Sequence, residues 1–379
     1  MYNAFRGCWV GLLLFILIAA QPSAAQTESD LQGPLIAVND NDDNGLVLFD
    51  LGTGQQRRLS FGIGEHILGD FSPDGCRLVF TWEQQPQRYN VYTVRIDGTD
   101  LQQLTDLRPD YRAWEPTWSP DGSRIAFTLM HYYQKPDEDE PERDSHIVWI
   151  APEGGDLHYY SSTGKEWQPR WSPDGSALVY VSEQPVLPTE GTPTPSPEEE
   201  DDLPKKPEVW VTQADASSRY RLTNYADGPA FNPRWSPDGN RIAVLFQPYE
   251  NLHRVMILDT NGTVLMALYR ELVTVLDHTW LPDSQGMVVA IQGMEGIEQN
   301  VLWRFSFADD SRTLVFDTDT MLYNDFPRFS ADGHWMALRR AYDLVIYDTQ
   351  DQTTHLLPNQ HNTPPVWSPS GFHDEATCR

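Results

Sequence analysis

Cysteine and paired histidine are scarce, and this excludes the commonest structural metal sites. The 379 residues include 3 cysteines and 10 scattered histidines. No cysteine pairs occur at the spacing of a zinc site, and no His-Glu-x-x-His is present. We expect no metal or other cofactor, apart from one calcium alternative considered below.

Positive charge is also scarce. Lysine and arginine number 27 against 55 aspartates and glutamates, so the formal net charge is −28. Such a surface repels phosphate backbones and anionic lipids, which argues against nucleic acid and membrane-surface partners. It favours basic or neutral partners, or divalent cations.

Nucleophile and phosphate-binding motifs are missing as well. The chain has no Gly-x-Ser-x-Gly and no phosphate-cradling glycine loop, which excludes an α/β-hydrolase half within it. Carboxylates are abundant, so an acid–base pair stays possible. We predict a binding protein rather than an enzyme.

Long hydrophobic runs are missing except at the N-terminus. Residues 1–25 combine Arg6, an apolar run, and small residues at Ser23 and Ala25, which is typical of a cleaved signal peptide. A retained anchor is the alternative, although the run is shorter than the roughly 20 residues that span a bilayer. Residues 26–34 are expected to be a linker, and we predict an exported protein without a later membrane span.

One five-residue pattern recurs along the rest of the chain. It reads aromatic-Ser-Pro-Asp-Gly, with degenerate later copies, at 71–75, 118–122, 171–175, 235–239, 280–284, 329–333 and 367–371. Proline, aspartate and glycine favour a β-turn, and an apolar strand such as 77–81 or 124–128 follows most copies. The copies lie roughly 40 to 60 residues apart, which is typical of propeller blades.

The motif, followed by Arg-Ile-Ala-Phe and a closing Leu-Thr, resembles the TolB-type, WD-like propeller repeat. The resemblance implies an all-β fold over 35–371, with four antiparallel strands in each blade. The segments at 35–39, 46–50 and 56–60 resemble the last three strands of a blade, and 366–367 supplies a lone first strand. Joining them closes a single seven-bladed β-propeller, followed by a tail at 372–379.

The closure also brings two cysteines together. Cys76 and Cys378 follow equivalent turns in neighbouring blades, whereas Cys8 lies in the signal segment. We predict a Cys76–Cys378 disulfide, with two independent thiols as the alternative.

Two blades carry acidic insertions between their second and third strands, at 130–145 and 183–207. The second is rich in proline and glutamate, so we expect a solvated loop; a docking element is the alternative.

The loops that lead into the first strands hold the candidate binding residues. Aromatic and polar side chains there are expected to surround the mouth of the central channel, and packing between blades is the alternative. These residues are Trp114, Glu115, Trp167, Gln168, Phe231, Asn232, Asp277, His278, Asp325 and Phe326.

A weak calcium-loop pattern lies at Asp40, Asp42 and Asn44. The acidic ligand expected at the twelfth position is missing, since Leu51 stands there, and Asn44-Gly45 favours a plain hairpin.

The leading hypothesis is a monomeric periplasmic, cell-envelope or extracellular scaffold that binds a protein or peptide at the channel mouth. A propeller that binds or cleaves a glycan is the alternative, and a sensor domain without its enzyme or membrane partner is a third reading. The motif indicates the fold and says little about function.

Overall fold

The computed structural model describes residues 30–40, 45–135, 142–160, 164–185, 205–250, 252–292, 300–315, 324–340, 343–357, 364–370, 372 and 374–378. The chain divides into two units, Met1–Asp30 and Leu31–Arg379, and all the described strands belong to the second. Residues 1–29, which include the predicted signal segment, lie outside the described residues. No helix in the described ranges is long and apolar enough to span a membrane.

The second unit is built from antiparallel sheets. The first contains β28 (Val366–Trp367), β1 (Leu35–Asp40), β2 (Gly45–Asp50) and β3 (Gln56–Ser60), in that order. The next contains β4 (His66–Phe71), β5 (Arg77–Gln85), β6 (Arg88–Arg95) and β7 (Gln102–Gln103). Through a parallel bridge between Tyr89 and Arg112, it joins β8 (Tyr111–Trp118), β9 (Ile125–Tyr133), β10 (Glu142–Ile150) and β11 (His158–Tyr159).

Four further sheets follow in chain order. They are β12 (Glu166–Trp171), β13 (Ala177–Pro185), β14 (Lys205–Gln213), β15 (Arg219–Arg221); β16 (Ala230–Trp235), β17 (Arg241–Tyr249), β18 (Leu252–Asp259), β19 (Val264–Val273); β20 (Val275–Trp280), β21 (Gly286–Ile291), β22 (Val301–Ser306), β23 (Arg312–Leu314); and β24 (Asn324–Phe329), β25 (Trp335–Arg340), β26 (Asp343–Asp348), β27 (Thr354–Leu357). A short 3-10 helix, η1 (Glu375–Cys378), follows β28.

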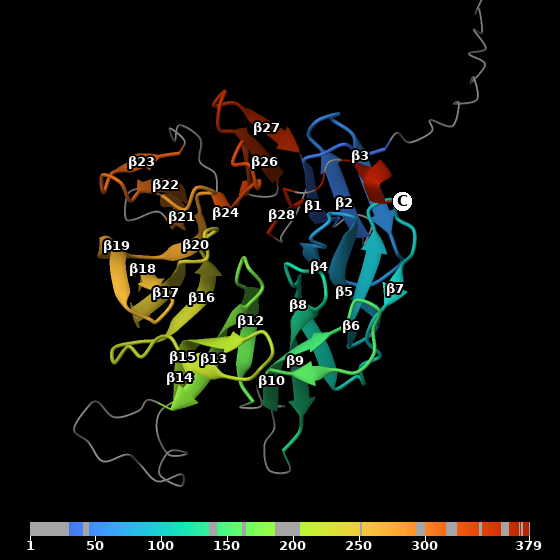
Figure 1. The fold of residues 1–379 in the computed structure, drawn as a ribbon, viewed down its shortest axis with the longest axis horizontal. Coiled ribbons are helices and arrows are strands. Elements are labelled where there is room, and N and C mark those ends of the chain that lie inside the picture. The colour runs from blue at the N-terminus through green and yellow to red at the C-terminus, as the bar shows by residue number, and fades with distance from the viewer. Residues whose placement is uncertain are drawn as a thin grey trace, which may run out of the picture. The chain divides into compact units, whose positions relative to one another are not determined.

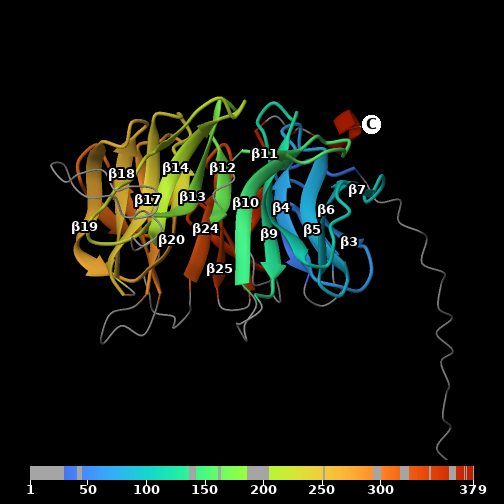
Figure 2. The ribbon, with the colours of Figure 1, turned by 90° about the horizontal axis from the view of Figure 1, so that it is seen from below.

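The first strand of each sheet faces a common centre, as Figure 1 shows for β4, β8, β12, β16, β20, β24 and β28. From the side, the strands run roughly at right angles to the plane of that view (Figure 2). Second and third strands are covered on both faces by the neighbouring sheets, which is why β1, β2 and β21 are buried along their whole length. This arrangement of four-stranded sheets is that of a β-propeller.

The recurring motif forms the turn between the first and second strands. In the 119–124 turn, the Ser119 hydroxyl accepts a hydrogen bond from Arg124 N (2.9 Å) and donates one to Asp121 (2.6 Å). Asp121 also accepts from Ser123 N at 3.0 Å, and Gly122 adopts a φ of 72°. The same bonds recur at Ser72, Ser172, Ser236 and Ser330. Serine, aspartate and glycine are therefore required by the turn, and their repetition carries no functional information.

Successive turns also contact one another. A Cβ atom on Gly122 would lie 3.8 Å from Pro73, and one on Gly175 would lie 3.4 Å from Pro120. The glycine of each of these turns therefore lies against the proline of the preceding turn. At Gly75, the neighbouring side chain is instead Phe372, from the C-terminal segment.

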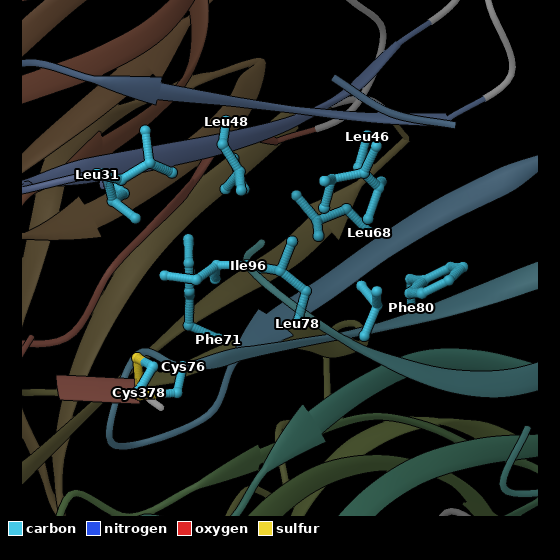
Figure 3. Packing of buried hydrophobic residues seen from close by; sticks show 14 of the residues in the cluster. Leu31, Leu46, Leu48, Leu68, Phe71, Cys76, Leu78, Phe80, Ile96 and Cys378 are labelled. Atoms are coloured by element: carbon cyan, nitrogen blue, oxygen red, sulfur yellow. A yellow bond between two sulfur atoms is a disulfide. The ribbon is translucent and has the colours of Figure 1, made fainter. Parts of the chain in front are cut away.

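The C-terminal segment closes the ring, as predicted. In β28, Trp367 pairs with Ile36, and the Ser368 hydroxyl accepts a hydrogen bond from Leu35 N at 3.0 Å. The predicted Cys76–Cys378 disulfide is present, with the Cα atoms 5.3 Å apart across 302 residues of sequence. It borders the apolar cluster that includes Leu31, Phe71 and Leu78 (Figure 3).

Two expected boundaries differ from the structure. Residues 31–34 of the expected linker belong to the folded unit, because Leu31 is buried and its N–H donates to Glu375 Oε2 at 2.9 Å. Within the expected tail at 372–379, the described residues 374–378 also belong to the fold, since Arg57 Nη1 lies 2.8 Å from Glu375 Oε2 in a buried ion pair.

The described ends of both expected insertions form strands. Residues 130–133 and 142–145 extend the β9–β10 hairpin, with Met130 opposite Ser145. Residues 183–185 and 205–207 likewise extend β13 and β14, with Glu183 opposite Pro207. Backbone pairing continues past the apolar core because the hydrogen bonds of a β-ladder join backbone groups and do not depend on apolar side chains. Residues 136–141 and 186–204 lie outside the described residues.

Candidate functional site

The candidate residues lie within the innermost strands, rather than in loops that lead into them. In β8, β12, β16 and β24 the register shifts across the residue before proline. That residue has a positive φ in each strand: 52° at Glu115, 60° at Gln168, 51° at Asn232 and 50° at Phe326. Proline has no N–H to donate to the ladder, so the strand accommodates it as a β-bulge, which redirects the neighbouring side chains.

The bulges of β8 and β12 help to form a mouth pocket of about 560 Å³. We use this name for the cavity lined by Trp114, Glu115, Trp167 and Gln168 together with Met130 and Glu183. Residues from the extended hairpin also line it, namely Glu142, Arg143 and Ser145, and so does Lys165. Four of the predicted residues are thus brought together, between two neighbouring innermost strands.

A second cavity, of about 650 Å³, lies among the innermost strands. We call it the channel cavity. Arginine side chains reach it from three of these strands, as Arg170 of β12, Arg234 of β16 and Arg328 of β24. The same three arginines line a further cavity of about 510 Å³, next to the motif turns of their strands.

One carboxylate holds two of these arginines. Asp277 of β20 is 2% exposed, and its oxygens lie 3.0 Å from Arg234 Nη2 and 2.7 Å from Arg328 Nη1. Burial alone would raise the pKa of Asp277, but the charges of Arg234 and Arg328 hold it well below its usual range. Asp277 therefore stays ionised and links three innermost strands.

The third arginine is held more loosely. Arg170 Nη1 donates to the Pro169 carbonyl at 2.8 Å, and Arg170 Nη2 lies 3.5 Å from Glu115 Oε1. Burial and the charge of Arg328 lower the pKa of Arg234 to about 10, and Arg170 adds to the lowering. The charges of Arg170 and Arg328 therefore oppose that of Arg234, in a cavity that is partly open to solvent.

Asp70 of β4 faces the same cavity. Its carboxylate accepts hydrogen bonds from Phe71 N (2.8 Å) and Thr117 Oγ1 (3.2 Å). Burial nevertheless raises the pKa of Asp70 to about 6. The negative charge of Asp70 is therefore partly lost under mildly acidic conditions.

The remaining predicted residues are dispersed. Phe231 packs against a core cluster and lies edge-on to His253. His278 is fully buried, and burial together with the charge of Arg234 lowers its pKa to about 3, so it is neutral at pH 7. Asp325 pairs with Arg339, whose guanidinium group lies 4.8 Å from the centre of the Phe326 ring. Asn232 Nδ2 lies 3.4 Å from Asp277 Oδ1, beside the channel arginines.

The three arginines were not among the residues predicted from the sequence. Each is the middle residue of a Pro-Arg-aromatic triplet, at 169–171, 233–235 and 327–329. Residues at the same motif position should lie on the same face of equivalent strands. This triplet could therefore have identified the cluster in advance.

The described residues gather no set of three or more histidine, cysteine, aspartate or glutamate side chains that could hold a metal ion. At the calcium-loop pattern, Asp40 pairs with Gly45 in the hairpin register, and its carboxylate lies 2.7 Å from Arg58 Nη1. Asp42 and Asn44 lie outside the described residues.

Comparison with known sequences gives short matches. No family model matches the chain. An uncharacterized protein of Agrobacterium fabrum is 30% identical over 142 residues, which cover 36% of this chain and 46% of that protein. An uncharacterized peptidase of Bacillus subtilis, YuxL, is 27% identical over 134 residues, 34% of this chain and 16% of the peptidase. The chain therefore spans less than half the length of these curated relatives.

Comparison with solved structures covers most of the chain. A puromycin hydrolase mutant complexed with PGG has a TM-score of 0.64 at 15% identity, over 89% of this chain and 55% of that one. An oligogalacturonate lyase in complex with manganese has a TM-score of 0.58 at 13% identity, over 85% of this chain and 89% of the lyase. TolB from Acinetobacter baumannii has a TM-score of 0.50 at 16% identity, over 89% and 83%.

These similarities define the class of fold. The chain has a TolB-like, WD40-like β-propeller fold, as the sequence motif indicated. Proteins of this fold include peptidases, a lyase and TolB, so the fold leaves the function open.

Proposed function

We propose that this protein is an exported, monomeric, non-enzymatic propeller that binds a protein or peptide segment at the mouth pocket. The observation that carries the proposal is that Trp114 and Trp167, next to equivalent bulges, line the same pocket together with Met130. Partly buried tryptophans that flank a hollow are typical anchors for an apolar side chain.

The charges around the pocket indicate the kind of segment. Glu115, Glu142 and Glu183 face the two cations Arg143 and Lys165, which leaves an excess of carboxylate at the mouth. Because the whole chain is also strongly acidic, we propose a segment with an apolar anchor and basic or neutral residues around it.

We further propose that the ring has seven blades. The eight-stranded sheet then counts as two blades, bridged only by the single pair of Tyr89 with Arg112. The disulfide supports export to an oxidising compartment.

A selection with defined peptides tests the binding proposal. A displayed library of random heptapeptides is selected on the purified protein, and enriched peptides are synthesised with amidated C-termini. Their affinities are then measured by fluorescence anisotropy. We expect the Trp114→Ala/Trp167→Ala protein to bind them at least about 30-fold more weakly, because truncating a hot-spot aromatic costs about 2 kcal/mol or more.

Two controls accompany this measurement. Tyr249→Ala removes an aromatic side chain that is 65% exposed and lies outside the pocket, and it should leave binding unchanged. Met130→Glu should weaken binding without removing a tryptophan from the fold. Failure of the library to enrich, or equal affinity for the double variant, would overturn the proposal.

A glycan ligand is the second candidate. The indole faces of Trp114 and Trp167, beside carboxylates, also suit a sugar ring. An array of neutral and acidic oligosaccharides separates the two candidates. Suppose that an oligosaccharide on the array binds, that this binding depends on Trp114 or on an added divalent cation, and that no peptide binds. This result would favour the glycan as ligand and would call for a test of catalysis.

A further inference from the structure

The channel cavity has a different electrostatic character from the rest of the chain. Arg170, Arg234 and Arg328 all reach it, in a protein whose formal net charge is −28. Only Asp277 lies within 3.0 Å of any of these guanidinium groups, among the ion pairs of the described residues. Two further carboxylates line the cavity: Glu115 lies 3.5 Å from Arg170 Nη2, and Asp70, whose pKa burial raises to about 6, interacts with the charge of Arg170.

The arrangement leaves hydrogen-bond donors facing the cavity. Arg234 and Arg328 each use one terminal nitrogen on Asp277, while Arg170 has no ion pair shorter than 3.5 Å. Guanidinium groups bind carboxylates through paired, charge-assisted hydrogen bonds. A bound anion would also reduce the repulsion among the three cations.

The two cavities adjoin. Trp114 and Glu115 line both the mouth pocket and the channel cavity, and Glu115 lies beside Arg170. A chain whose side chain rests between Trp114 and Trp167 can therefore extend towards the arginines.

We propose that Arg170, Arg234 and Arg328 bind a free carboxylate of the peptide that occupies the mouth pocket. This inference rests on the proposed function and adds a specificity element to it. The carboxylate belongs either to the C-terminus of the peptide or to an aspartate or glutamate side chain. The peptide then presents its apolar anchor and any basic residues to the acidic mouth, and its carboxylate to the channel.

The lining of the channel favours a peptide over an acidic sugar. Pro116, Pro364, Pro365 and Trp367 present apolar surface beside the arginines. Sugar hydroxyl groups buried against such surface would lack hydrogen-bond partners, whereas peptide side chains and a terminal carboxylate fit it.

Matched probes test the carboxylate directly. Ac-Trp-Ala-Ala is prepared with a free C-terminus and as its amide, and Ac-Trp-Ala-Glu-amide is paired with Ac-Trp-Ala-Gln-amide. Dissociation constants come from saturation-transfer NMR titrations at two salt concentrations, with trigalacturonate as a separate arm. We expect at least about tenfold tighter binding for one carboxylate-bearing probe of a pair than for its neutral partner, weakening at higher salt. The pair that shows the difference identifies the source of the carboxylate.

The Arg170→Gln protein is the main variant, because Arg170 takes no part in the Asp277 ion pairs. We expect the preference for the carboxylate probe to fall to about twofold or less, with the affinity for the neutral probe unchanged. Arg304→Gln, on exposed β22 surface, is the matched control and should keep the full preference.

A second variant protects the test against misfolding. Arg234→Gln, Arg328→Gln and Asp277→Asn together remove two cations and the carboxylate that they share, and this variant should also abolish the preference. Equal binding of the paired probes by the native protein, or an unchanged preference in Arg170→Gln, would overturn the inference while leaving peptide binding at the mouth intact. Loss of binding to every peptide probe would refute the proposed function itself, and Arg170-dependent binding of trigalacturonate alone would assign the cavity to a glycan.

Discussion

Removing the Cys76–Cys378 bond should weaken the whole ring, because this bond ties its first complete sheet to the end of the chain. The bond spans 302 residues of sequence, for which chain entropy predicts about 6 kcal/mol of stabilisation. Measured values usually fall below this limit, at about 2–5 kcal/mol. We therefore expect the Cys76→Ser/Cys378→Ser protein, in a background that also carries Cys8→Ser, to lose about 3 kcal/mol.

Urea unfolding followed by tryptophan fluorescence measures the loss. With a slope of about 3 kcal/mol per molar urea, a loss of 3 kcal/mol lowers the midpoint by about 1 M. Reduction of the native protein should reproduce the shift. Amide hydrogen exchange supplies the local readout. The amides of β28 and β1 should exchange faster in the variant, because only two residue pairs join these strands and the disulfide no longer holds the C-terminal segment in place.

If the midpoint and the exchange of β1 and β28 are the same with and without the disulfide, the noncovalent contacts of the C-terminal segment close the ring unaided. The bond would then contribute nothing to closure.

Three further predictions concern stability. Arg57→Ala should cost about 3–5 kcal/mol in chemical denaturation, because it leaves the buried Glu375 carboxylate without its cation; full stability would show that the pair is dispensable. Gly69→Ala should lower the melting temperature sharply, since the new Cβ would lie 2.3 Å from the Pro116 carbonyl oxygen; an unchanged melting temperature would refute this close approach. Asp70 has a raised folded pKa of about 6, so it stabilises the protein below its unfolded pKa of 3.8, and that stabilisation is lost as the pH rises through 6. The stability of Asp70→Asn relative to the native protein should therefore increase between pH 4 and pH 7, and a constant difference over this range would contradict the raised pKa.

Much of the fold could be predicted from the sequence because a turn with strict chemistry marks each sheet. Serine, aspartate and glycine each make a defined contact in the turn, as at Ser119, Asp121 and Gly122, so the repeat is visible without any structure. The closing strand followed from counting strands at both ends of the chain.

The candidate site was predicted less completely. Trp114 and Trp167 were found because aromatic residues stand out beside proline, but their position inside a strand depends on the bulge. Glu115 and Gln168 have a positive φ, which non-glycine residues rarely adopt, so the sequence does not predict this backbone conformation. The repeated Pro-Arg-aromatic triplet places the channel arginines at equivalent positions, but the sequence gives no sign that Asp277, from another strand, holds two of them.

The use of the final residues to complete the first sheet has a consequence for biosynthesis. β1, β2 and β3 leave the ribosome early, yet their sheet receives β28 only when residues 366–367 have been made. The turn at Gly75 likewise packs against Phe372 only after residue 372 has been made, and Cys76 can form its disulfide only after Cys378 has been made. Folding from the N-terminus during synthesis, the usual course for a domain, therefore cannot finish here. A nascent or prematurely ended chain that lacks β28 exposes the inner edge of β1.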